Sequence, residues 1–503
     1  MTITLIDRAA QYSGRIAIID DTGEYPYHRL LSESGCVARH LLNGAADLRE
    51  ARVAFLAPPG FDYARVQWGI WRAGGIAVPL AVSHPPPELE YVIADSGAAV
   101  VVAHPDFADR LRPIAAAQGR RFLLTDELTG PPAEALPDVS PARRAMIVYT
   151  SGTTGKPKGV VTTHFNIQAM VTTLVQAWGW QPDDHILHVL PLHHVHGIVN
   201  VLTCALWSGA VCEFLPKFQP DAVWARFIER PLTLFMAVPT IYARLIAAWQ
   251  AAPPEAQAQL SAACRKLRLM VSGSAALPVS VLEQWRHISG HTLLERYGMT
   301  EIGMALSNPL HGERRPGFVG APLPGVSLRL VNEQGQVINT DDIPGEIQVQ
   351  GPMVFKEYWQ RPQATHAAFA AGWFRTGDTA LRNRGSYRIL GRNSVDIIKT
   401  AGYKVSALEI EETLRQHPAI GECAVIGVPD ADLGQRVCAA IVAAPGAPPP
   451  GFDSLRDWAA ARLAPYKVPR QFALLDALPR NAMGKVTKPA LHPLFEASEG
   501  EGG

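Results

Sequence analysis

The feature that most constrains the fold is a loop rich in glycine, hydroxyl and lysine side chains, which directly follows an apolar segment. The apolar segment, Ala145–Tyr149, has the length of a buried strand. The loop, residues 150–159, holds four hydroxyl side chains, three glycines and two lysines. Glycine lets backbone N–H groups approach phosphate oxygens, hydroxyls add donors, and lysines offset negative charge. The sequence therefore predicts a polyphosphate-binding loop at the end of a strand.

The spacing within this loop differs from that of the common P-loop. Gly152 and Gly155 are three residues apart, and Pro157 follows Lys156, so the Gly-x4-Gly-Lys-Ser/Thr pattern is absent. The alternative is an ordinary flexible polar loop, but such a loop has no need for so many donors and cations behind a buried strand.

The rest of the chain indicates an α/β fold in two parts. Helical periods alternate with short β-rich runs such as Val53–Leu56 and Ala98–Ala103, as expected of a parallel sheet wrapped by helices. The chain of 503 residues is long for one hydrophobic core. The pattern of helical and β-rich segments changes close to Arg392. We therefore expect an N-terminal domain over residues 1–392 and a C-terminal domain over 393–503.

Composition excludes several classes of protein. Lys plus Arg and Asp plus Glu both number 46, so no overall charge favours nucleic acid or an anionic membrane. The six cysteines contain no CxxC pair, which argues against a zinc site or a disulfide framework. No apolar run reaches the roughly 18 to 20 residues of a membrane helix, and the first residues lack the pattern of a secretory signal. We therefore expect a cytoplasmic protein, monomeric or homodimeric, with no membrane span and no nucleic-acid partner.

Further motifs follow the phosphate loop in a fixed order. They are Ser272–Ala276, Tyr297–Glu301, Gly345–Ile347, Trp373–Asp378, Gly391–Arg392, Gly402–Val405 and Pro479–Lys485. With the loop they resemble the successive motifs of the adenylate-forming superfamily of acyl-CoA synthetases, luciferases and peptide-synthetase adenylation domains. The resemblance covers essentially the whole chain. It implies a large N-terminal domain of α/β subdomains with a β-barrel-like portion, and a small, mobile C-terminal α+β domain.

The resemblance implies an ATP-dependent acid–CoA ligase. In this family a carboxylate attacks the α-phosphorus of ATP and expels pyrophosphate, and the thiol of coenzyme A then takes the acyl group from the acyl-adenylate. Because phosphate charge is the obstacle, the first step needs a cation and a metal at the phosphates. By resemblance Lys485 is that cation, Thr300 contacts the α-phosphate, and Glu301 positions Mg²⁺.

The same resemblance assigns the nucleotide site. Asp378 would hold both ribose hydroxyls, Arg392 would be a second ribose contact, and Tyr297 would stack on adenine, with a core role as the alternative for this tyrosine. The full set implied for ATP or AMP is Thr150, Ser151, Gly152, Thr153, Thr154, Gly155, Lys156, Lys158, Gly273, Ser274, Ala275, Arg296, Tyr297, Gly298, Met299, Asp378 and Arg392.

After adenylation, members of this family rotate the C-terminal domain for thioester formation. The hinge should lie among Asn393–Asp396. Three residues separate Arg392 from Asp396 where two are usual, so the pivot residue stays open. Gly402 and Tyr403 resemble the loop beside the channel for the pantetheine arm of coenzyme A.

The acyl pocket offers clues to the acid. Pro191–Gly197 resembles the acyl-pocket motif, in which His194 can gate the entry of carboxylate and thiol, whereas for His193 a core role is the simpler reading. Arg244 stands beside this pocket, where a fatty or aromatic acid would need no cation. A buried arginine usually has a carboxylate partner.

Together with Glu295–Glu301, these residues resemble the malonyl-CoA synthetase branch of the family. Arg244, helped by Arg296, would bind the second carboxylate of malonate or methylmalonate, and Met299 would limit the length of the acyl chain. Alternatively, Arg244 pairs with a structural acid or lies on a helix surface.

Three other functions stay open. The first two are a CoA ligase for an aromatic or fatty monocarboxylic acid and a stand-alone adenylation domain that loads a carrier protein. The third is a catalytically inactive binding protein, which would require the loss of a charge-handling group. Lys158, Glu301, Asp378, Arg392 and Lys485 are nevertheless all present.

Overall fold

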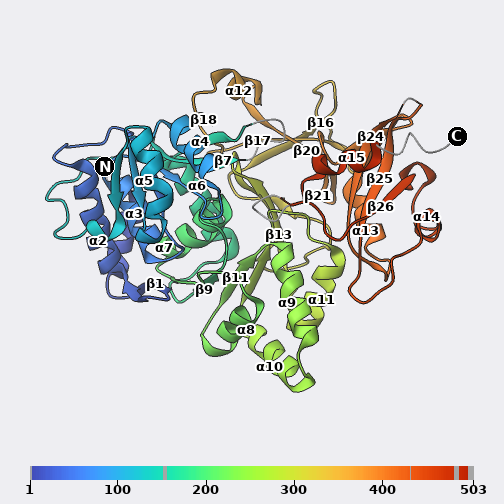
Figure 1. Cartoon of the computed structure of the whole chain (residues 1–503), viewed down its shortest axis with the longest axis horizontal. Helices are drawn as coiled ribbons and strands as arrows, with labels where there is room; N and C mark the ends of the chain where they lie inside the picture. The colour runs from blue at the N-terminus through green and yellow to red at the C-terminus, as the bar shows by residue number, and fades with distance from the viewer. Residues whose placement is uncertain (1–2, 151–155, 431, 481–485, 497–503) are drawn as a thin grey trace.

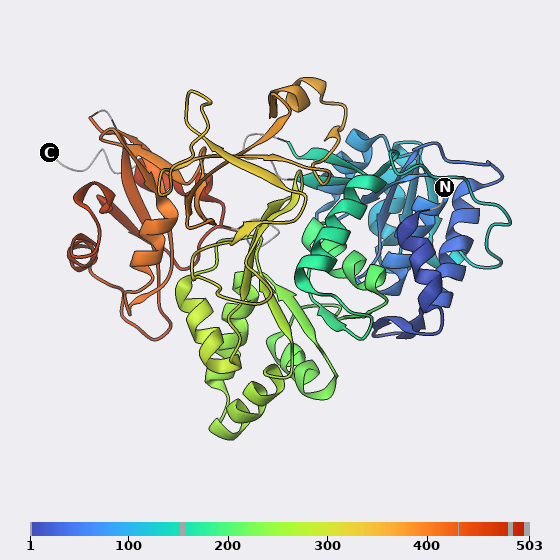
Figure 2. The ribbon, with the colours of Figure 1, turned by 180° about the vertical axis from the view of Figure 1, so that it is seen from behind.

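Four β-sheets and their covering helices form the described part of the chain. The computed structural model describes residues 3–150, 156–430, 432–480 and 486–496. The N-terminal portion and the last sheet lie at opposite ends of the molecule, and the middle of the chain lies between them (Figures 1 and 2).

The sheet that carries the phosphate loop has seven strands in the order β18-β8-β7-β4-β3-β5-β6. Their bounds are β3 (Arg52–Leu56), β4 (Ile76–Pro79), β5 (Val100–Ala103), β6 (Arg121–Leu124), β7 (Arg144–Thr150), β8 (Lys158–Thr163) and β18 (Glu357–Tyr358). Parallel pairing runs from β7 through β4, β3 and β5 to β6. The helices of this region are α2 (Tyr27–Leu42), α3 (Phe61–Arg72), α4 (Pro86–Ser96) and α5 (Ala108–Ala117). Every residue of β5 is buried, which explains its unbroken apolar sequence.

A nine-stranded sheet forms the centre of the molecule, in the order β15-β14-β13-β12-β11-β9-β10-β1-β2. Its strands are β1 (Ile16–Asp20), β2 (Gly23–Pro26), β9 (His185–His188), β10 (Val211–Phe214), β11 (Leu234–Ala237), β12 (Leu269–Ser272), β13 (Leu294–Met299), β14 (Gly303–Ser307) and β15 (Ala321–Pro322). Its helices include α6 (His164–Trp178), α7 (Cys204–Ser208), α8 (Pro220–Glu229), α9 (Pro239–Ala251), α10 (Pro254–Cys264) and α11 (Val279–Ser289). A capping box of Thr163 and Asn166 begins α6, and Gly179 in the left-handed conformation ends it.

Two five-stranded sheets complete the fold. The third contains β16 (Ser327–Val331), β17 (Gly345–Gln350), β19 (Phe369–Ala370), β20 (Trp373–Asn383) and β21 (Ser386–Arg392), beside α12 (Pro362–Ala367). The fourth contains β22 (Ile397–Thr400), β23 (Tyr403–Ser406), β24 (Ile420–Asp430), β25 (Gly434–Ala443) and β26 (Gln471–Leu474), with α13 (Ala407–Leu414), α14 (Phe452–Ala460) and α15 (Pro493–Glu496). The chain thus passes from the third sheet to the fourth between Arg392 and Ile397.

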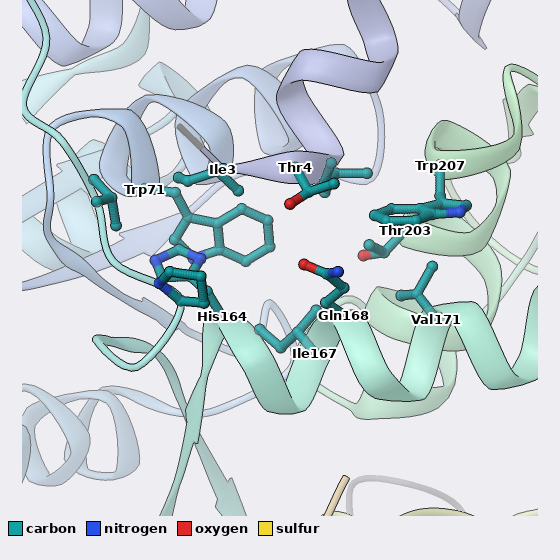
Figure 3. A pocket seen from close by; sticks show the side chains of 12 residues that line it. Ile3, Thr4, Trp71, His164, Ile167, Gln168, Val171, Thr203 and Trp207 are labelled. Carbon is teal, nitrogen blue, oxygen red and sulfur yellow. The ribbon is translucent and has the colours of Figure 1, made fainter. Parts of the chain in front are cut away.

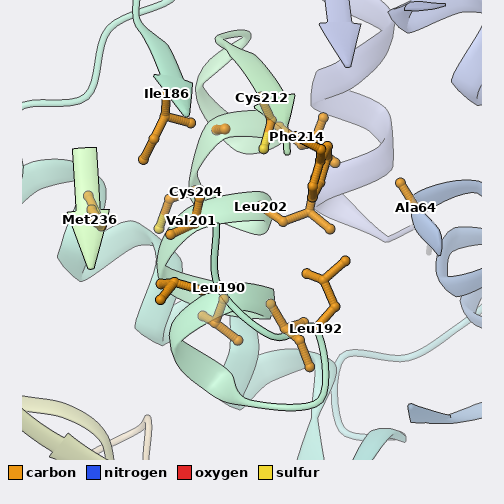
Figure 4. Close-up of a cluster of buried hydrophobic side chains, with 14 of the residues drawn as sticks. Ala64, Ile186, Leu190, Leu192, Val201, Leu202, Cys204, Cys212, Phe214 and Met236 are labelled. Atoms are coloured by element: carbon orange, nitrogen blue, oxygen red, sulfur yellow. The ribbon is translucent and has the colours of Figure 1, made fainter. Parts of the chain in front are cut away.

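The largest hydrophobic core lies under the central sheet. Figure 4 shows side chains from β9, β10 and β11 beside those of a π-helix, η4 (His196–Thr203), and of α7. All eight residues of the π-helix are buried. A π-helical turn widens the helix and is often found at functional sites, and this one begins within the predicted acyl-pocket motif, since His196 and Gly197 belong to both.

The predicted fold class is confirmed, and most of the segments that we expected to be strands are strands. Val53–Leu56 falls within β3, and Ala145–Tyr149 falls within β7. The strand β9 ends at His188, before the acyl-pocket motif begins at Pro191. No helix among the described residues combines the length and the apolar character needed to cross a bilayer.

Candidate active site

One cavity of about 930 Å³ collects most of the predicted site residues. It lies where the carboxyl ends of β12 and β13 meet β20, β21 and the helix α13, as expected for ligand sites in α/β folds. The predicted residues that line it are Thr150, Lys158, His194, Arg244, Gly273, Ser274, Ala275, Arg296, Tyr297, Gly298, Met299, Thr300, Glu301, Asp378 and Arg392. The predicted residues Ser151–Gly155 and Lys485 lie outside the described residues.

The predicted ribose acid is held by two partners. The Tyr297 hydroxyl donates to Asp378 Oδ2 at 2.6 Å, and Arg392 Nε lies 3.1 Å from Asp378 Oδ1. The first contact joins the central sheet to the third sheet, since Tyr297 lies on β13 and Asp378 lies on β20. The second contact lies within the third sheet, between the paired strands β20 and β21. Tyr297, which we predicted to stack on adenine, therefore also orients the carboxylate.

The predicted metal-positioning carboxylate is buried and oriented. Glu301 is 6% exposed, and the Tyr358 hydroxyl donates to its Oε1 at 2.9 Å. Burial raises the pKa of Glu301 above its ordinary value, while the hydrogen bond from Tyr358 opposes that rise. Lys158 Nζ lies 5.2 Å from the centre of the Tyr358 ring. Tyr358 thus connects the end of the phosphate loop with Glu301, a role that no sequence motif indicated.

The side chains of the two lysines at the end of the phosphate loop lie in different surroundings. Lys158 lines the cavity, whereas Lys156 Nζ lies 5.4 Å from the centre of the Tyr91 ring and is not among the lining residues. The Tyr91 hydroxyl donates to the carbonyl of Pro157, between the two lysines, at 2.8 Å. Lys158 is therefore the better placed of the two for a phosphate inside the cavity.

A buried arginine lies against the predicted adenine loop. Arg296 is 3% exposed, and its Nη2 lies 3.2 Å from Ser274 Oγ. A Cβ on Gly273 would come within 2.5 Å of the Arg296 guanidinium carbon, so a larger residue here would displace the guanidinium from its present position. Ser274 Oγ also lies 3.2 Å from Nδ1 of His196, at the start of the π-helix. Burial lowers the pKa of Arg296 to about 9.

Arg296 forms no ion pair with an acidic side chain in the described part of the chain, and its buried Nε has no hydrogen-bond partner there. Arg244, on α9, lines the same cavity and is exposed. It too makes no ion pair with the acids of the described ranges, which argues against the structural-acid alternative. The expectation of a buried Arg244 is not met, because the side chain faces the open cavity from the helix surface.

The two adjacent histidines of the acyl-pocket motif differ in position. His194 lines the cavity. His193 does not, and its ring packs against His194 and His84 with centroid distances of 4.1 and 5.6 Å. Burial lowers the pKa of His193 to about 4, aided by the charge of His84, so the ring is neutral at physiological pH. These positions agree with a core role for His193.

The fourth sheet and the segments beside it contribute some residues to the cavity lining, but the residues predicted to bind CoA are not among them. Val395, Asp396, Glu412, Val486 and Lys488 line the cavity. The predicted CoA residues do not, since neither Gly402 nor Tyr403 is among the lining residues; Tyr403 is half exposed and stacks on Tyr466 with 4.1 Å between ring centres.

Sequence analysis missed a buried acid in this cavity. Glu295, next to Arg296 on β13, is 6% exposed, and its Oε1 has no hydrogen-bond partner among the described residues. Burial raises the pKa of Glu295 to about 8, and the nearby charge of Glu412 adds to the rise. A hydrogen bond from the backbone of Gly317 opposes this rise in the pKa, and the net shift favours the protonated carboxyl group. The only sequence signal for Glu295 was its place at the start of the segment Glu295–Glu301, two residues before Tyr297.

A second, much smaller pocket lies near the N-terminus, between Trp71, His164, Gln168 and Trp207 (Figure 3). Its volume is about 20 Å³, enough for a single water molecule. It takes no part in the site.

The cavity brings together the acid predicted to hold ribose, the acid predicted to position a metal, and Thr150 and Lys158 from the two ends of the predicted phosphate loop, as expected of an enzyme of nucleotide-dependent acid activation. The chain belongs to the AMP-binding enzyme family: residues 5–359 match AMP-binding enzyme, and residues 409–485 match the AMP-binding enzyme C-terminal domain.

Similar proteins are known for the whole length of the chain. The human malonate–CoA ligase ACSF3, mitochondrial, is 49% identical, over 98% of this chain and 92% of that protein. The malonate–CoA ligase of Arabidopsis thaliana is 42% identical, over 98% and 88%. Among solved structures, ATP-bound MatB from Rhodopseudomonas palustris matches with a TM-score of 0.91 and 35% identity, over 99% of each chain, whereas apo MatB gives 0.81. The arrangement of this chain is therefore closer to that of ATP-bound MatB than to that of apo MatB.

Proposed function

We propose that the protein is a malonate–CoA ligase. It joins one carboxylate of malonate to AMP with release of pyrophosphate, and then transfers the malonyl group to the thiol of coenzyme A with release of AMP. The names of the human and Arabidopsis relatives support this substrate. Methylmalonate, which carries the same two carboxylates, is the closest alternative acid.

The observation that carries the proposal is the buried guanidinium of Arg296. A buried charge is costly unless an opposite charge or several hydrogen bonds compensate it. Arg296 faces the cavity with one hydroxyl contact, to Ser274, and no acidic partner among the described residues. A substrate with a second carboxylate supplies that partner, and Arg244 on the same cavity supplies another cation. An aromatic or fatty monocarboxylic acid would leave both arginines unpaired.

The nucleotide end of the cavity fits ATP. Asp378, oriented by Tyr297 and Arg392, is placed to accept from the two ribose hydroxyls, while Thr150 and Lys158 line the side from which the phosphate loop continues. Preoriented donors and cations act on the charge that develops at the α-phosphorus. We assign the bridging cation to Lys485, whose sequence neighbour Val486 lines the cavity.

We also propose Mg²⁺ as the metal. No cluster of three or more His, Cys, Asp or Glu side chains capable of holding a metal occurs in the described ranges. Mg²⁺ is commonly held by one or two carboxylates together with phosphates and water, and the oriented carboxylate of Glu301 fits that pattern. When bound, Mg²⁺ would offset the charge of the phosphates.

The cellular context stays a proposal. A cytoplasmic location and a monomeric or homodimeric state are our expectations from the sequence, while the four vertebrate relatives carry "mitochondrial" in their names. A stand-alone adenylation domain that loads a carrier protein is the remaining rival, and the relatives' names favour coenzyme A as the acceptor.

A panel of acids tests the proposed function. Purified protein with Mg²⁺, ATP and coenzyme A should release pyrophosphate and form a thioester with malonate. Turnover with methylmalonate should be lower, and turnover with propionate, benzoate or octanoate should be at least about 100-fold lower, because these acids leave buried charge unpaired. Equal kcat/KM for propionate and malonate would contradict the substrate assignment, and no acid-dependent ATP consumption at all would contradict the ligase itself.

A further inference from the structure

A partly buried cluster of charged side chains lies where the third and fourth sheets join. We call Asp396, Glu411, Arg415 and Lys488 the joint cluster. Lys488 Nζ lies 2.6 Å from Asp396 Oδ1 and 2.7 Å from Glu411 Oε1. Arg415 Nη2 lies 3.0 Å from Glu411 Oε2, and its Nη1 lies 3.3 Å from Oε2 of Glu412, which borders the cluster. The four residues of the cluster itself are two cations and two anions. Its formal charges cancel.

The lysine at the centre of the joint cluster is firmly ionised. Lys488 is 8% exposed. Burial alone would lower the pKa of its ammonium, but the carboxylates of Glu411 and Asp396 outweigh burial and raise it. An ammonium held between two carboxylates fixes three parts of the chain at once, since directional charged hydrogen bonds are stronger than neutral ones.

One of those parts is the short connection between the sheets. Asp396 uses its second oxygen, Oδ2, to accept from the backbone N–H of Arg392 at 3.1 Å. A side chain on Gly391, whose φ is +128°, would clash with Asp396, so glycine allows this close approach. Arg392 in turn contacts Asp378 through its side chain. A continuous chain of contacts therefore runs from Lys488 through Asp396 and Arg392 to the ribose acid.

The second part is the small sheet itself. Glu411, on α13, also accepts from the backbone N–H of Val425 on β24 at 2.9 Å. The hydrogen bond from Val425 and the ion pair with Arg415 would still compensate the charge of Glu411 if Lys488 were removed. The stability of the fourth sheet therefore does not depend on Lys488 alone, which makes a positional role separable from a structural one.

The third part is the segment that follows Lys485 in the sequence. Val486 and Lys488 both line the cavity, and Val486 forms an isolated β-bridge with Arg480. We propose that Lys488 is a positioning residue for adenylation, whose ammonium holds the wall formed by Val486 and Lys488 against Asp396 and Glu411 while the acyl-adenylate forms. This inference rests on the proposed function, in which adenylation takes place in the arrangement of sheets described above.

The test separates the two half-reactions in the full-length protein. We would measure acid-dependent exchange of labelled pyrophosphate into ATP, and thioester formation from supplied acyl-adenylate, for Lys488→Met, Lys488→Arg and the control Lys266→Met, which removes an exposed lysine on the large domain. For Lys488→Met we expect a loss of about 100-fold in exchange, the size of effect that a misplaced active-site wall produces, and a much smaller loss in thioester formation. Lys488→Arg should restore most of the exchange, and Lys266→Met should change neither reaction.

A second measurement is independent of the acid. Hydrogen–deuterium exchange of residues 486–491 should be faster in Lys488→Met than in the wild type. If Lys488→Met does not fold, the double variant Lys488→Met/Asp396→Asn, which keeps the joint cluster neutral, should fold and show the same two effects. Equal losses in both half-reactions, an unchanged pyrophosphate exchange, or unchanged protection of residues 486–491 would each overturn the proposal. Absence of malonate-dependent exchange in the wild type would instead refute the proposed substrate, and the hydrogen exchange would still report on Lys488.

Discussion

The two ends of the cavity differ in how their charged groups are satisfied. At the nucleotide end, Asp378 and Glu301 each have a protein partner, in Tyr297 and Arg392 for the first and Tyr358 for the second. At the acyl end, neither Arg296 nor Arg244 pairs with an acid among the described residues. Paired groups are held in position before a ligand arrives. Unpaired cations, in contrast, are most stable when the ligand brings its own negative charge.

This difference suggests a division of labour. The nucleotide end is built to orient a ligand that every member of such a family shares, whereas the acyl end selects the acid through charge that only the right acid can neutralise. The two ends should therefore respond differently to substitution. Changes at the acyl end should reduce the use of malonate and leave ATP binding intact, and changes at the nucleotide end should do the reverse.

The largest effect should come from Arg296→Gln. Removing one partner of a fully buried charged contact with the substrate costs about 1,000-fold in kcat/KM for malonate. Steady-state kinetics with varied malonate and, separately, the dissociation constant of ATP from titration calorimetry would measure the effect. ATP affinity should change by less than about threefold. A comparable loss in ATP affinity would place Arg296 at the nucleotide end, the other role that its motif implied.

Arg244→Ala should have a smaller effect on the same end. Arg244 is exposed, so water screens its attraction for a carboxylate and replaces part of it on removal. We expect the KM for malonate to rise about 30-fold, with Arg244→Lys recovering part of the loss because it keeps the charge without the planar fork. The matched control is Arg286→Ala, on the outer part of α11 and outside the cavity lining. Unchanged malonate kinetics in Arg244→Ala would mean that Arg296 alone selects the acid through its charge.

The sequence predicted those parts of the site that depend on local pattern. The strand β7 follows from the apolar run Ala145–Tyr149, and the motif residues at the ends of β12 and β13 meet in one cavity because these neighbouring strands are parallel and end at the same edge. These predictions needed no knowledge of which strand pairs with which. Motif order along the chain was sufficient.

The parts that sequence analysis missed depend on contacts between distant segments. Tyr358 lies on the two-residue strand β18, 57 positions from Glu301, and its role appears only when β18 pairs with β8. Lys488 and Asp396 are 92 positions apart. No local pattern indicates such a pair, because pairing and register are set by tertiary packing. The position of Gly402 and Tyr403 could not be predicted from the sequence either, because their distance from the cavity depends on how the fourth sheet is placed.

Tyr297→Phe probes the nucleotide end with a small change. It removes the hydroxyl that donates to Asp378 and keeps the aromatic ring. A hydrogen bond to a charged group contributes enough that we expect the KM for ATP to rise about 10-fold, while the KM for malonate stays the same. Fluorescence titration with a nucleotide analogue would show whether the change lies in binding. If the malonate KM rises equally, the two ends of the cavity are coupled and the division of labour fails.

The smallest effect concerns Glu295, a buried acid of the cavity wall that accepts a hydrogen bond from the backbone of Gly317 and has no ion-pair partner among the described residues. Burial raises its pKa from an ordinary value of 4.5 to about 8, with a further contribution from Glu412. A group of this kind stabilises the fold fully below its unfolded pKa, and that stability is lost as pH rises through the folded pKa of about 8. Glu295→Gln keeps the neutral form at every pH. Relative to this variant, the wild type should lose about 1 to 3 °C of melting temperature between about pH 5 and 9.

The exposed Glu283, on α11, provides the control for this prediction, since Glu283→Gln should leave the pH dependence of melting unchanged. Parallel melting curves for wild type and Glu295→Gln would mean that Glu295 stays ionised and has a cationic partner. The nearest cation along the strand is Arg296, so that result would also remove the unpaired guanidinium on which the selection of malonate depends. The pH dependence of one buried carboxyl group therefore tests the difference between the two ends of the cavity without any substrate present.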